Sequence, residues 1–345
     1  MGALSHIYVD PAIAADSGAG SRADPYGDVE WAIEQTTFDA TNGTQVNIKA
    51  GTDEILAAEL SVAMADTGTS IAWLPTEGAP CIFRGYTAET DDGGIGGLSG
   101  GGSVSVYNDP IFDYVCFIDL HCHDTGAAVV LRFDNSGTVI NCEIDNTTAA
   151  GIEGDNNCTI INSYIHDIGG VGIDIAGGNI QYNFFENGAK EMTVVIVHGG
   201  TQGLVIMRNI IKVSDDTRGI TVSDNSIACF NSVWCDGGTA EGFMITGARY
   251  GIMCANNIAE GFSGAGGVGF NFSHAQGRLT WYDGNVSYNN TQDYRAPGDK
   301  TIFGLSDNEV LTESPFTDAA NGDFSPVNTG NVKEGSLPGE FGGGQ

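Results

Sequence analysis

The chain has 345 residues, including 51 glycines, and 44 acidic residues against 13 lysines and arginines give it a net charge of −31. This charge opposes binding to nucleic acids and to anionic membranes, because both would repel a strongly acidic protein. It also opposes unaided binding of a polyanionic sugar, which bound Ca²⁺ would have to bridge; no other cofactor is expected. No apolar stretch is long enough for insertion into a bilayer.

Residues 1–43 are predicted to form an N-terminal strand and a capping helix. The alternating segment HIYVDP (6–11) is typical of a strand, and Asp28 is expected to cap a short helix that follows it. The apolar face of this helix is expected to consist of Val29, Ala32 and Ile33. Such a helix would cover the apolar core and unpaired backbone at the open end of a stack of strands.

Residues 44–290 are predicted to form stacked coils, irregular over 44–103 and regular over 104–290. The segment TQVNIKAGT (44–52) reads as the next strand, ended by a glycine. The run DDGGIGGLSGGGS (91–103) is expected to leave the stack as a mobile excursion, because its glycines offer little side chain to pack. A phosphate-binding loop is not expected there, since no Lys followed by Ser or Thr and no helix comes after it.

The regular part repeats one unit: an apolar opening that alternates, a tight polar turn, a second short apolar run and an Asn. Successive openings lie 21 to 27 residues apart. They are Ile152, Ile173, Val195, Ile220, Phe243 and Phe270. A period of this size with short strands predicts an all-β solenoid, here a single parallel β-helix of roughly ten coils.

An asparagine between apolar residues recurs in each coil. These residues are Asn141, Asn162, Asn183, Asn209, Asn231, Asn257 and Asn285. Equivalent residues of a parallel stack lie about 4.8 Å apart. The asparagines are therefore predicted to form a ladder of amides at one inner corner, with a structural role.

The eight cysteines show no spacing typical of a metal site, and several fall within apolar runs. We expect reduced, buried and unreactive thiols, as in a protein made in a bacterial cytoplasm. The first twenty residues do not resemble a signal peptide, because they lack a basic start followed by an apolar run.

Residues 291–345 are predicted to form a C-terminal cap and tail. The strand and amphipathic helix of 1–43 resemble the start of right-handed parallel β-helix proteins of the pectate-lyase-like superfamily. The segment SPFTDAANGDFSP resembles the closing segment of bacterial and phage β-helix proteins, which folds back over the last coil. The whole chain is similar to phage tailspikes and head-decorating spikes in its architecture.

This resemblance implies a virion surface or extracellular location, after synthesis in the cytoplasm without a signal peptide. It also implies a homotrimer in contact with other virion proteins and, through one face, with a cell-surface polysaccharide of the host. Polygalacturonases carry a Gly-His-Gly motif. It is incomplete here, because His198 precedes a glycine but follows Val197. Pectate lyases use a basic residue on a strand beside calcium-binding acids, and nothing local identifies it among Arg132, Arg208 and Arg218, so the sequence favours a role other than catalysis.

Function is expected along one outward column of ionisable residues. In the register of the asparagines, this column reads His123, Asp145, His166, Glu186 and Lys212. All five are candidates for ligand binding, and Asp145, His166, Glu186 and Lys212 are the candidates for catalysis. The alternative without function is a solvated face on which unlike charges alternate.

Three kinds of chemistry remain open at this column. Asp145 and Glu186 would lie about 10 Å apart across His166, a separation that suits the acid and base of an inverting glycoside hydrolase. Lys212 or His166 would instead remove a proton beside a uronate carboxylate while a cation is held by the acids. His123, Asp145 and His166 would ligate a transition metal, but no dedicated metal spacing is present, and a lone His-x-His at 121–123 is a weak signal.

The preferred interpretation is a structural or adhesive β-helix of a phage virion surface that binds host glycans. The alternative is a polysaccharide lyase or glycoside hydrolase acting on an extracellular polysaccharide. A third interpretation is a bacterial cell-surface protein exported by a non-classical route, and neighbouring genes for capsid or for secretion would separate it from the first.

Overall fold

A computed structural model describes residues 3–60, 75–109, 113–133, 135–186, 195–197, 203–214, 217–223, 225–246, 251–272, 280–295 and 308–327. The chain divides into two compact units, Met1–Tyr164 and Ile165–Gln345, and each is considered by itself. His198 and the tail (335–345) lie outside the described residues. No described helix is long and apolar enough to cross a membrane.

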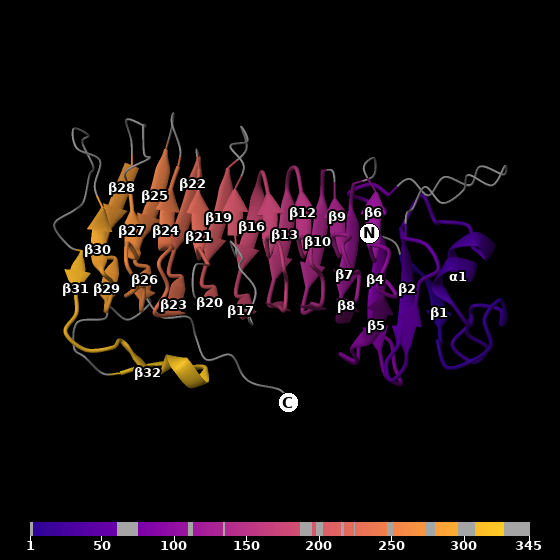
Figure 1. The fold of residues 1–345 in the computed structure, drawn as a ribbon. Coiled ribbons are helices and arrows are strands. Elements are labelled where there is room, and N and C mark those ends of the chain that lie inside the picture. The colour runs from indigo at the N-terminus through magenta and orange to yellow at the C-terminus, as the bar shows by residue number, and fades with distance from the viewer. Residues whose placement is uncertain are drawn as a thin grey trace. The chain divides into compact units, whose positions relative to one another are not determined.

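The first unit is built from coils that add parallel strands to three sheets, and the third sheet begins only with the third coil (Figure 1). Its first sheet contains β1 (Ser5–Val9), β2 (Thr44–Lys49), β4 (Cys81–Tyr86), β7 (Val115–Ile118), β10 (Gly137–Ile140) and β13 (Cys158–Ile161). The second contains β3 (Asp53–Ile55), β5 (Gly96–Ser99), β8 (Leu120–His123) and β11 (Glu143–Ile144). The third contains β6 (Tyr107–Asp109), β9 (Leu131–Phe133) and β12 (Ile152–Gly154).

The second unit repeats this arrangement, and β14 (Tyr164–His166) lies at the division in the sequence. Its first sheet contains β16 (Gly178–Gln181), β19 (Leu204–Met207), β22 (Ser226–Cys229), β25 (Ile252–Ala255) and β28 (Thr280–Asp283). The second contains β17 (Phe184–Glu186), β20 (Ile210–Ser214), β23 (Ser232–Asp236), β26 (Ile258–Glu260), β29 (Val286–Tyr288) and β31 (Glu309–Val310). The third contains β15 (Ile173–Ile175), β18 (Val195–Val197), β21 (Ile220–Val222), β24 (Glu241–Ile245), β27 (Val268–Asn271) and β30 (Gln292–Arg295). In the part of the chain that the structure describes, the third sheet has nine strands, so coils with all three strands are fewer than the roughly ten expected.

The alternation of the strands fills the interior with apolar side chains. Ile173 and Ile175 are fully buried, as the pattern of the sequence predicts. In the first unit, the rings of Phe83 and Phe117 stack on neighbouring coils with centroids 5.2 Å apart. All eight cysteines are free thiols, and all are buried except Cys116, which is half-buried. Burial raises the pKa of the Cys142 thiol to about 12, so the thiol is unreactive at neutral pH.

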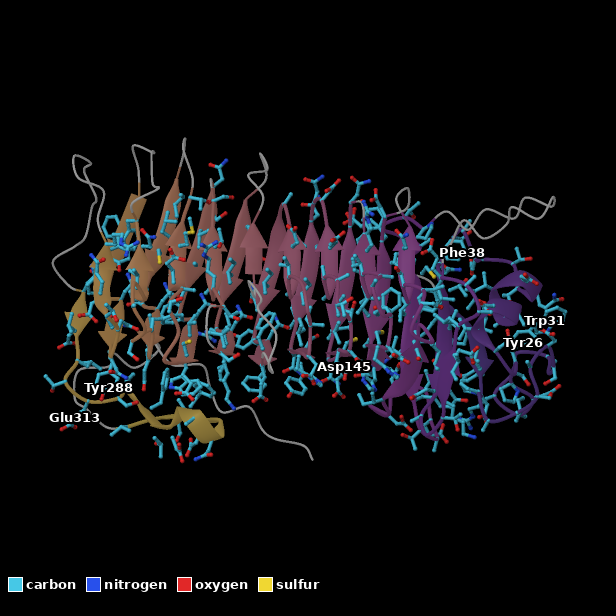
Figure 2. All side chains as sticks on the ribbon, viewed as in Figure 1. Tyr26, Trp31, Phe38, Asp145, Tyr288 and Glu313 are labelled. Atoms are coloured by element: carbon cyan, nitrogen blue, oxygen red, sulfur yellow. The ribbon has the colours of Figure 1, made fainter. Side chains whose placement is uncertain are left out.

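The predicted N-terminal helix is confirmed as α1 (Val29–Gln35). Its N-cap is Asp28, whose carboxylate accepts a hydrogen bond from the backbone N–H of Trp31 (labelled in Figure 2). The face formed by Val29, Ala32 and Ile33 is buried, so the helix covers apolar surface as expected.

The prediction that residues 91–103 leave the stack is wrong. They include β5, a fully buried strand that pairs with β3 and β8 in the second sheet. Gly96 is required by close packing, because a Cβ there would lie 2.7 Å from the carbonyl oxygen of Ile48.

The asparagine ladder is confirmed in the second unit. Asn183, Asn209, Asn231, Asn257 and Asn285 are fully buried. Each donates its side-chain N–H, at 2.9–3.1 Å, to the Oδ1 of the next, and Asn285 donates to Asn308. The backbone N–H of each residue donates to the same oxygen at 2.9–3.1 Å.

Asn141 and Asn162 do not belong to this buried position, so the expected register is wrong by one residue in the first unit. Both have a left-handed backbone, with φ of 54° and 53°, the conformation that Tyr182 takes one residue before Asn183. Asn162 is exposed and donates to Oδ1 of Asn141 at 3.1 Å, outside the core. The inner position belongs instead to Cys142 and Ser163, where the N–H of Cys142 donates to Oγ of Ser163 at 3.2 Å.

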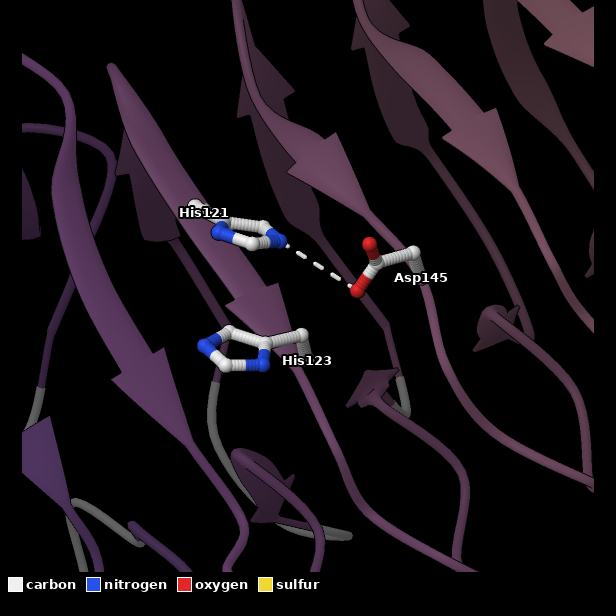
Figure 3. A group of neighbouring side chains, drawn as sticks. All are labelled: His121, His123 and Asp145. Carbon is white, nitrogen blue, oxygen red and sulfur yellow. Dashed lines mark hydrogen bonds and ion pairs between the residues drawn. The ribbon is translucent and has the colours of Figure 1, made fainter. Parts of the chain in front are cut away.

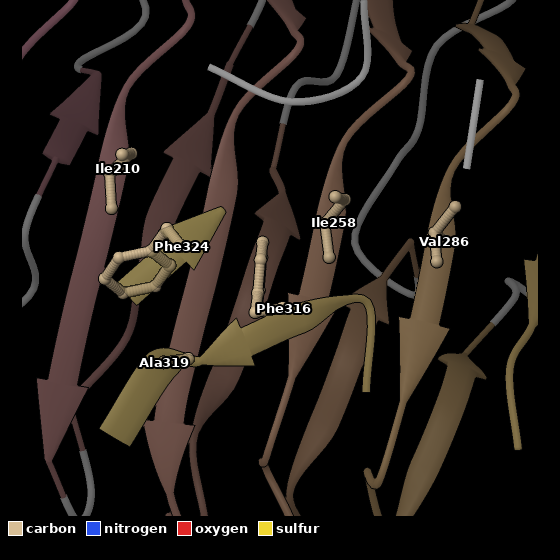
Figure 4. Close-up of a cluster of buried hydrophobic side chains, with 6 residues drawn as sticks. All are labelled: Ile210, Ile258, Val286, Phe316, Ala319 and Phe324. Atoms are coloured by element: carbon tan, nitrogen blue, oxygen red, sulfur yellow. The ribbon is translucent and has the colours of Figure 1, made fainter. Parts of the chain in front are cut away.

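The C-terminal segment packs along the side of the second unit rather than over its last coil alone. It forms β32 (Phe316–Asp318), the short 3₁₀ helix η2 (Ala319–Asn321) and β33 (Asp323–Pro326). Phe316 and Phe324 lie on the outer face of the second sheet, across several coils (Figure 4). The cluster also contains Ile210, Ile258, Val286 and Ala319. This cover explains why Ile210, Ile258 and Val286, on the outer face of these strands, are apolar.

Candidate functional site

A cluster of two histidines and two aspartates lies on the outer face of the second sheet in the first unit. In the register of the sheet, Asp53 is opposite Gly97, which is opposite His121. His123 lies two residues after His121 on the same strand, and Asp145 directly follows β11 on the neighbouring coil. Alternation along β8 directs Cys122 between the histidines into the core, where it is fully buried.

The two imidazole rings are stacked, with centroids 4.1 Å apart and an angle of 15° between their planes (Figure 3). Asp145 faces them, and its Oδ1 lies 3.2 Å from Nε2 of His121 in a hydrogen bond. This hydrogen bond, opposed by burial and reinforced by the negative charges of Asp145 and Glu143, raises the pKa of His121. The side chains of His121, His123 and Asp145 are 28%, 17% and 16% exposed, so small solutes can reach the cluster.

Asp53 approaches His123 from the other side. Its Oδ2 lies 3.3 Å from Nε2 of His123, a buried nitrogen without a hydrogen bond in the structure. Asp53 reaches this place because residue 97 is glycine, and a Cβ there would collide with the Asp53 carboxylate. The Gly-rich segment therefore shapes the site as well as the stack.

Glu186 and Lys212 meet in the second unit. They are opposite each other on adjacent strands, and Nζ of Lys212 donates to Oε1 of Glu186 at 2.7 Å. The same row continues with Trp234, Glu260 and Tyr288. The sequence places Glu186 and Lys212 in one column, and the structure confirms that they are neighbours.

His166 belongs to the second unit, where its Nδ1 lies 2.9 Å from a carboxylate oxygen of Asp167. The predicted column thus divides between the units: His123 and Asp145 belong to the first, and His166, Glu186 and Lys212 to the second. The expected separation of Asp145 and Glu186 across His166 stays a prediction. Within the first unit, the partner of Asp145 is His121, which the sequence singled out only as half of a weak His-x-His signal.

Sequence reasoning missed two buried carboxyl groups. Glu54 points into the core under the N-terminal helix, and burial together with the charges of Asp28 and Glu30 raises its pKa to about 7. Glu260 lies beneath the C-terminal segment, and burial raises its pKa to about 7 although Ser314 donates a hydrogen bond to it. Alternation in β3 was a signal for Glu54, because Asp53 and Ile55 on either side are exposed.

No family model matches this chain, and no curated protein matches its sequence. Among solved structures, the chain is similar to pectate lyase Pel9A, with a TM-score of 0.55 and 13% identity over 99% of this chain and 91% of that one. It also aligns with the GH136 lacto-N-biosidase from Eubacterium ramulus, with a TM-score of 0.48 and 10% identity over 89% of this chain and 67% of that one.

The fold follows from these observations together. Parallel strands in three sheets, rows of apolar side chains inside and a likeness to Pel9A along almost the whole chain have one common explanation. The protein is a right-handed parallel β-helix of the pectate-lyase-like fold.

Proposed function

We propose that this protein binds carbohydrate through the outer face of its second sheet. The observation that carries the proposal is the arrangement of ionisable side chains on neighbouring strands of this face. His123 and Asp145 belong to it in the first unit, and the Glu186–Lys212 pair belongs to it in the second. Such groups offer donors and acceptors to sugar hydroxyls at the spacing of the strands, about 4.8 Å. The likeness in fold to a pectate lyase supports a carbohydrate ligand.

Binding is tested with an array of bacterial polysaccharides, followed by titration calorimetry on any glycan bound. Lys212→Ala is expected to weaken binding of that glycan at least tenfold, because it removes a charged hydrogen-bonding partner. Lys49→Ala is the matched control, since Lys49 also pairs with a carboxylate, that of Asp10, but lies on the first sheet. The proposal fails if no glycan binds above background, or if Lys49→Ala weakens binding as much as Lys212→Ala.

The finer proposal is display on a phage virion as a homotrimer, in contact with other virion proteins. A C-terminal segment that folds back on the coils supports the resemblance to spike proteins. A partly exposed apolar row on the first sheet of the second unit supports association. Val205, Ile227, Met253 and Trp281 are opposite one another on successive strands, and Trp281 is 52% exposed. In a chain of charge −31, an uncharged row is where copies meet with least repulsion.

Capsid or portal genes beside the gene for this chain are the expected observation, and secretion genes there would oppose the virion proposal.

Cleavage of the bound polysaccharide is the second candidate function. The neighbouring amine and carboxylate of Lys212 and Glu186 favour it, because a base beside an acid is the arrangement that proton transfer needs. Incubation with the same panel distinguishes the two functions. Unsaturated uronate products or new reducing ends, lost in Glu186→Ala, would establish an enzyme, whereas binding without product supports adhesion alone.

A further inference from the structure

We propose that His121, His123 and Asp145 form a binding site for a divalent transition-metal ion such as Zn²⁺. The inference goes beyond carbohydrate binding and does not depend on it. The sequence left a metal at His123, Asp145 and His166 open without a dedicated spacing, and only the stacking of the coils brings His121 together with His123 and Asp145.

The donor atoms are close enough for one ion. One ligand atom each of His121, His123 and Asp145 lies within 4.8 Å of the other two. Zinc–nitrogen and zinc–oxygen bonds of 2.0–2.2 Å in a tetrahedron place neighbouring donors about 3.3 Å apart. Nε2 of His121 and Oδ1 of Asp145 already lie 3.2 Å apart. Binding therefore requires only a small closure of His123 toward this pair.

The scaffold holds the donors in place before any ion arrives. Both histidines stand on β8 and face the same side, because residues two apart in a strand do so. Asp145 follows β11, which pairs with β8 in the same sheet. Ligands mounted on rigid strands lose little conformational entropy on binding, which favours affinity.

A carboxylate supports one of the two histidines from outside the three donors. Oδ2 of Asp53 lies 3.3 Å from Nε2 of His123, so Nδ1 of that ring is the nitrogen that would bind the ion. Asp53 is held there by the space over Gly97. A carboxylate beside the imidazole of a ligand orients the ring and increases its basicity, and Asp53 is placed for that role.

The donors select the class of metal. Imidazole nitrogens suit Zn²⁺, Cu²⁺, Ni²⁺ and Fe²⁺, whereas Ca²⁺ and Mg²⁺ prefer oxygen ligands alone. Acidic side chains elsewhere on this protein will attract Ca²⁺ and Mg²⁺ as well, so only a histidine site distinguishes Zn²⁺ from them. Three protein ligands leave a fourth position of a tetrahedral ion for water or for an oxygen of a bound molecule.

The test is calorimetric titration of the full chain with Zn²⁺ in a large excess of Mg²⁺, which occupies sites made only of carboxylates. One Zn²⁺ per chain is expected to bind, and His121→Gln and His123→Gln are expected to weaken binding at least tenfold. Gly97→Ala displaces Asp53 from His123. Loss of a carboxylate that orients a metal ligand is expected to weaken Zn²⁺ binding about tenfold. His6→Gln, which removes an exposed histidine of the first unit, is the control and is expected to bind like the wild type.

Substitution with Co²⁺ gives a second readout that does not depend on affinity. Visible absorption bands typical of tetrahedral nitrogen and oxygen ligation are expected in the wild type and are expected to be lost in His121→Gln. Circular dichroism identifies any variant that fails to fold. The proposal is overturned if Zn²⁺ does not bind in excess Mg²⁺, or if folded His121→Gln and His123→Gln bind it as tightly as the wild type.

Discussion

Every polar atom of the Asn231 side chain is hydrogen-bonded to a neighbouring coil or to its own turn. Its Oδ1 accepts from the backbone and side-chain N–H groups of Asn209, and its Nδ2 donates to Oδ1 of Asn257 and to the carbonyl of Ile206. Because the residue is fully buried, water cannot replace any of these partners. The ladder thus satisfies turn backbone that a solenoid cannot satisfy within one coil.

We expect Asn231→Ala to reduce the free energy of unfolding by about 3 kcal/mol or more, since it leaves several buried donors and acceptors without partners. Urea unfolding measures this change. Asn162→Gly is the matched control and is expected to change stability by less than about 1 kcal/mol, because its side chain is exposed and its left-handed backbone suits glycine. Equal losses in the two variants would contradict the separation of Asn162 from the buried ladder.

At the scale of elements, the C-terminal segment is fastened by apolar contacts and by one acid. Phe316 and Phe324 cover Ile258 and Ile210, and Ser314 donates a hydrogen bond to Glu260 at the edge of this cover. Glu260 is almost fully buried, so its neutral form is favoured in the folded state.

This burial makes attachment of the segment dependent on pH. The pKa of Glu260 is raised from 4.5 to about 7, so its contribution to stability is complete below pH 4.5 and is lost as pH rises through 7. The difference is on the order of 3 kcal/mol between the two limits. The free energy of unfolding is expected to fall less between pH 4.5 and pH 7 in Glu260→Gln than in the wild type. Urea unfolding and hydrogen exchange of residues 309–327 measure this change.

Glu313→Gln is the control for loss of one charge, because Glu313 is exposed on the same segment (labelled in Figure 2). The wild-type decline is expected to persist in this variant. Glu54 has a raised pKa for a similar reason in the first unit and contributes a decline of the same sign, so the part due to Glu260 is the difference between the wild type and Glu260→Gln. A decline unchanged in Glu260→Gln would show that Glu260 does not control it.

At the scale of the whole molecule, the charge of −31 limits the surfaces through which copies associate. The apolar row from Val205 to Trp281 is the surface we propose for the homotrimer. Ile227→Glu with Trp281→Glu is expected to reduce the mass measured by light scattering to that of a monomer, because it places negative charge within the contact. Ile55→Glu is the control, since Ile55 is exposed on the second sheet of the first unit. A wild type that is monomeric at high concentration would contradict the homotrimer.

The sequence by itself determined the solenoid, because its signals are local and repeated. Alternation at Ile173 and Ile175 and the cap at Asp28 can each be recognised from a few neighbouring residues. The buried asparagines from Asn183 onward recur once in each coil. A glycine run gives no such signal, so β5 was mistaken for an excursion. Its packing depends on the backbone of neighbouring coils, which no local pattern reveals.

Only the tertiary structure decided which polar side chains meet. A shift of one residue moves a side chain to the opposite face of a strand, and the asparagines of the first unit were misplaced by that amount. The contact of Asp145 with His121, and of Asp53 with His123 across Gly97, depends on stacking order and on an absent side chain. The fold follows from a periodic pattern, whereas the site depends on distances between coils, which are set by how the chain packs.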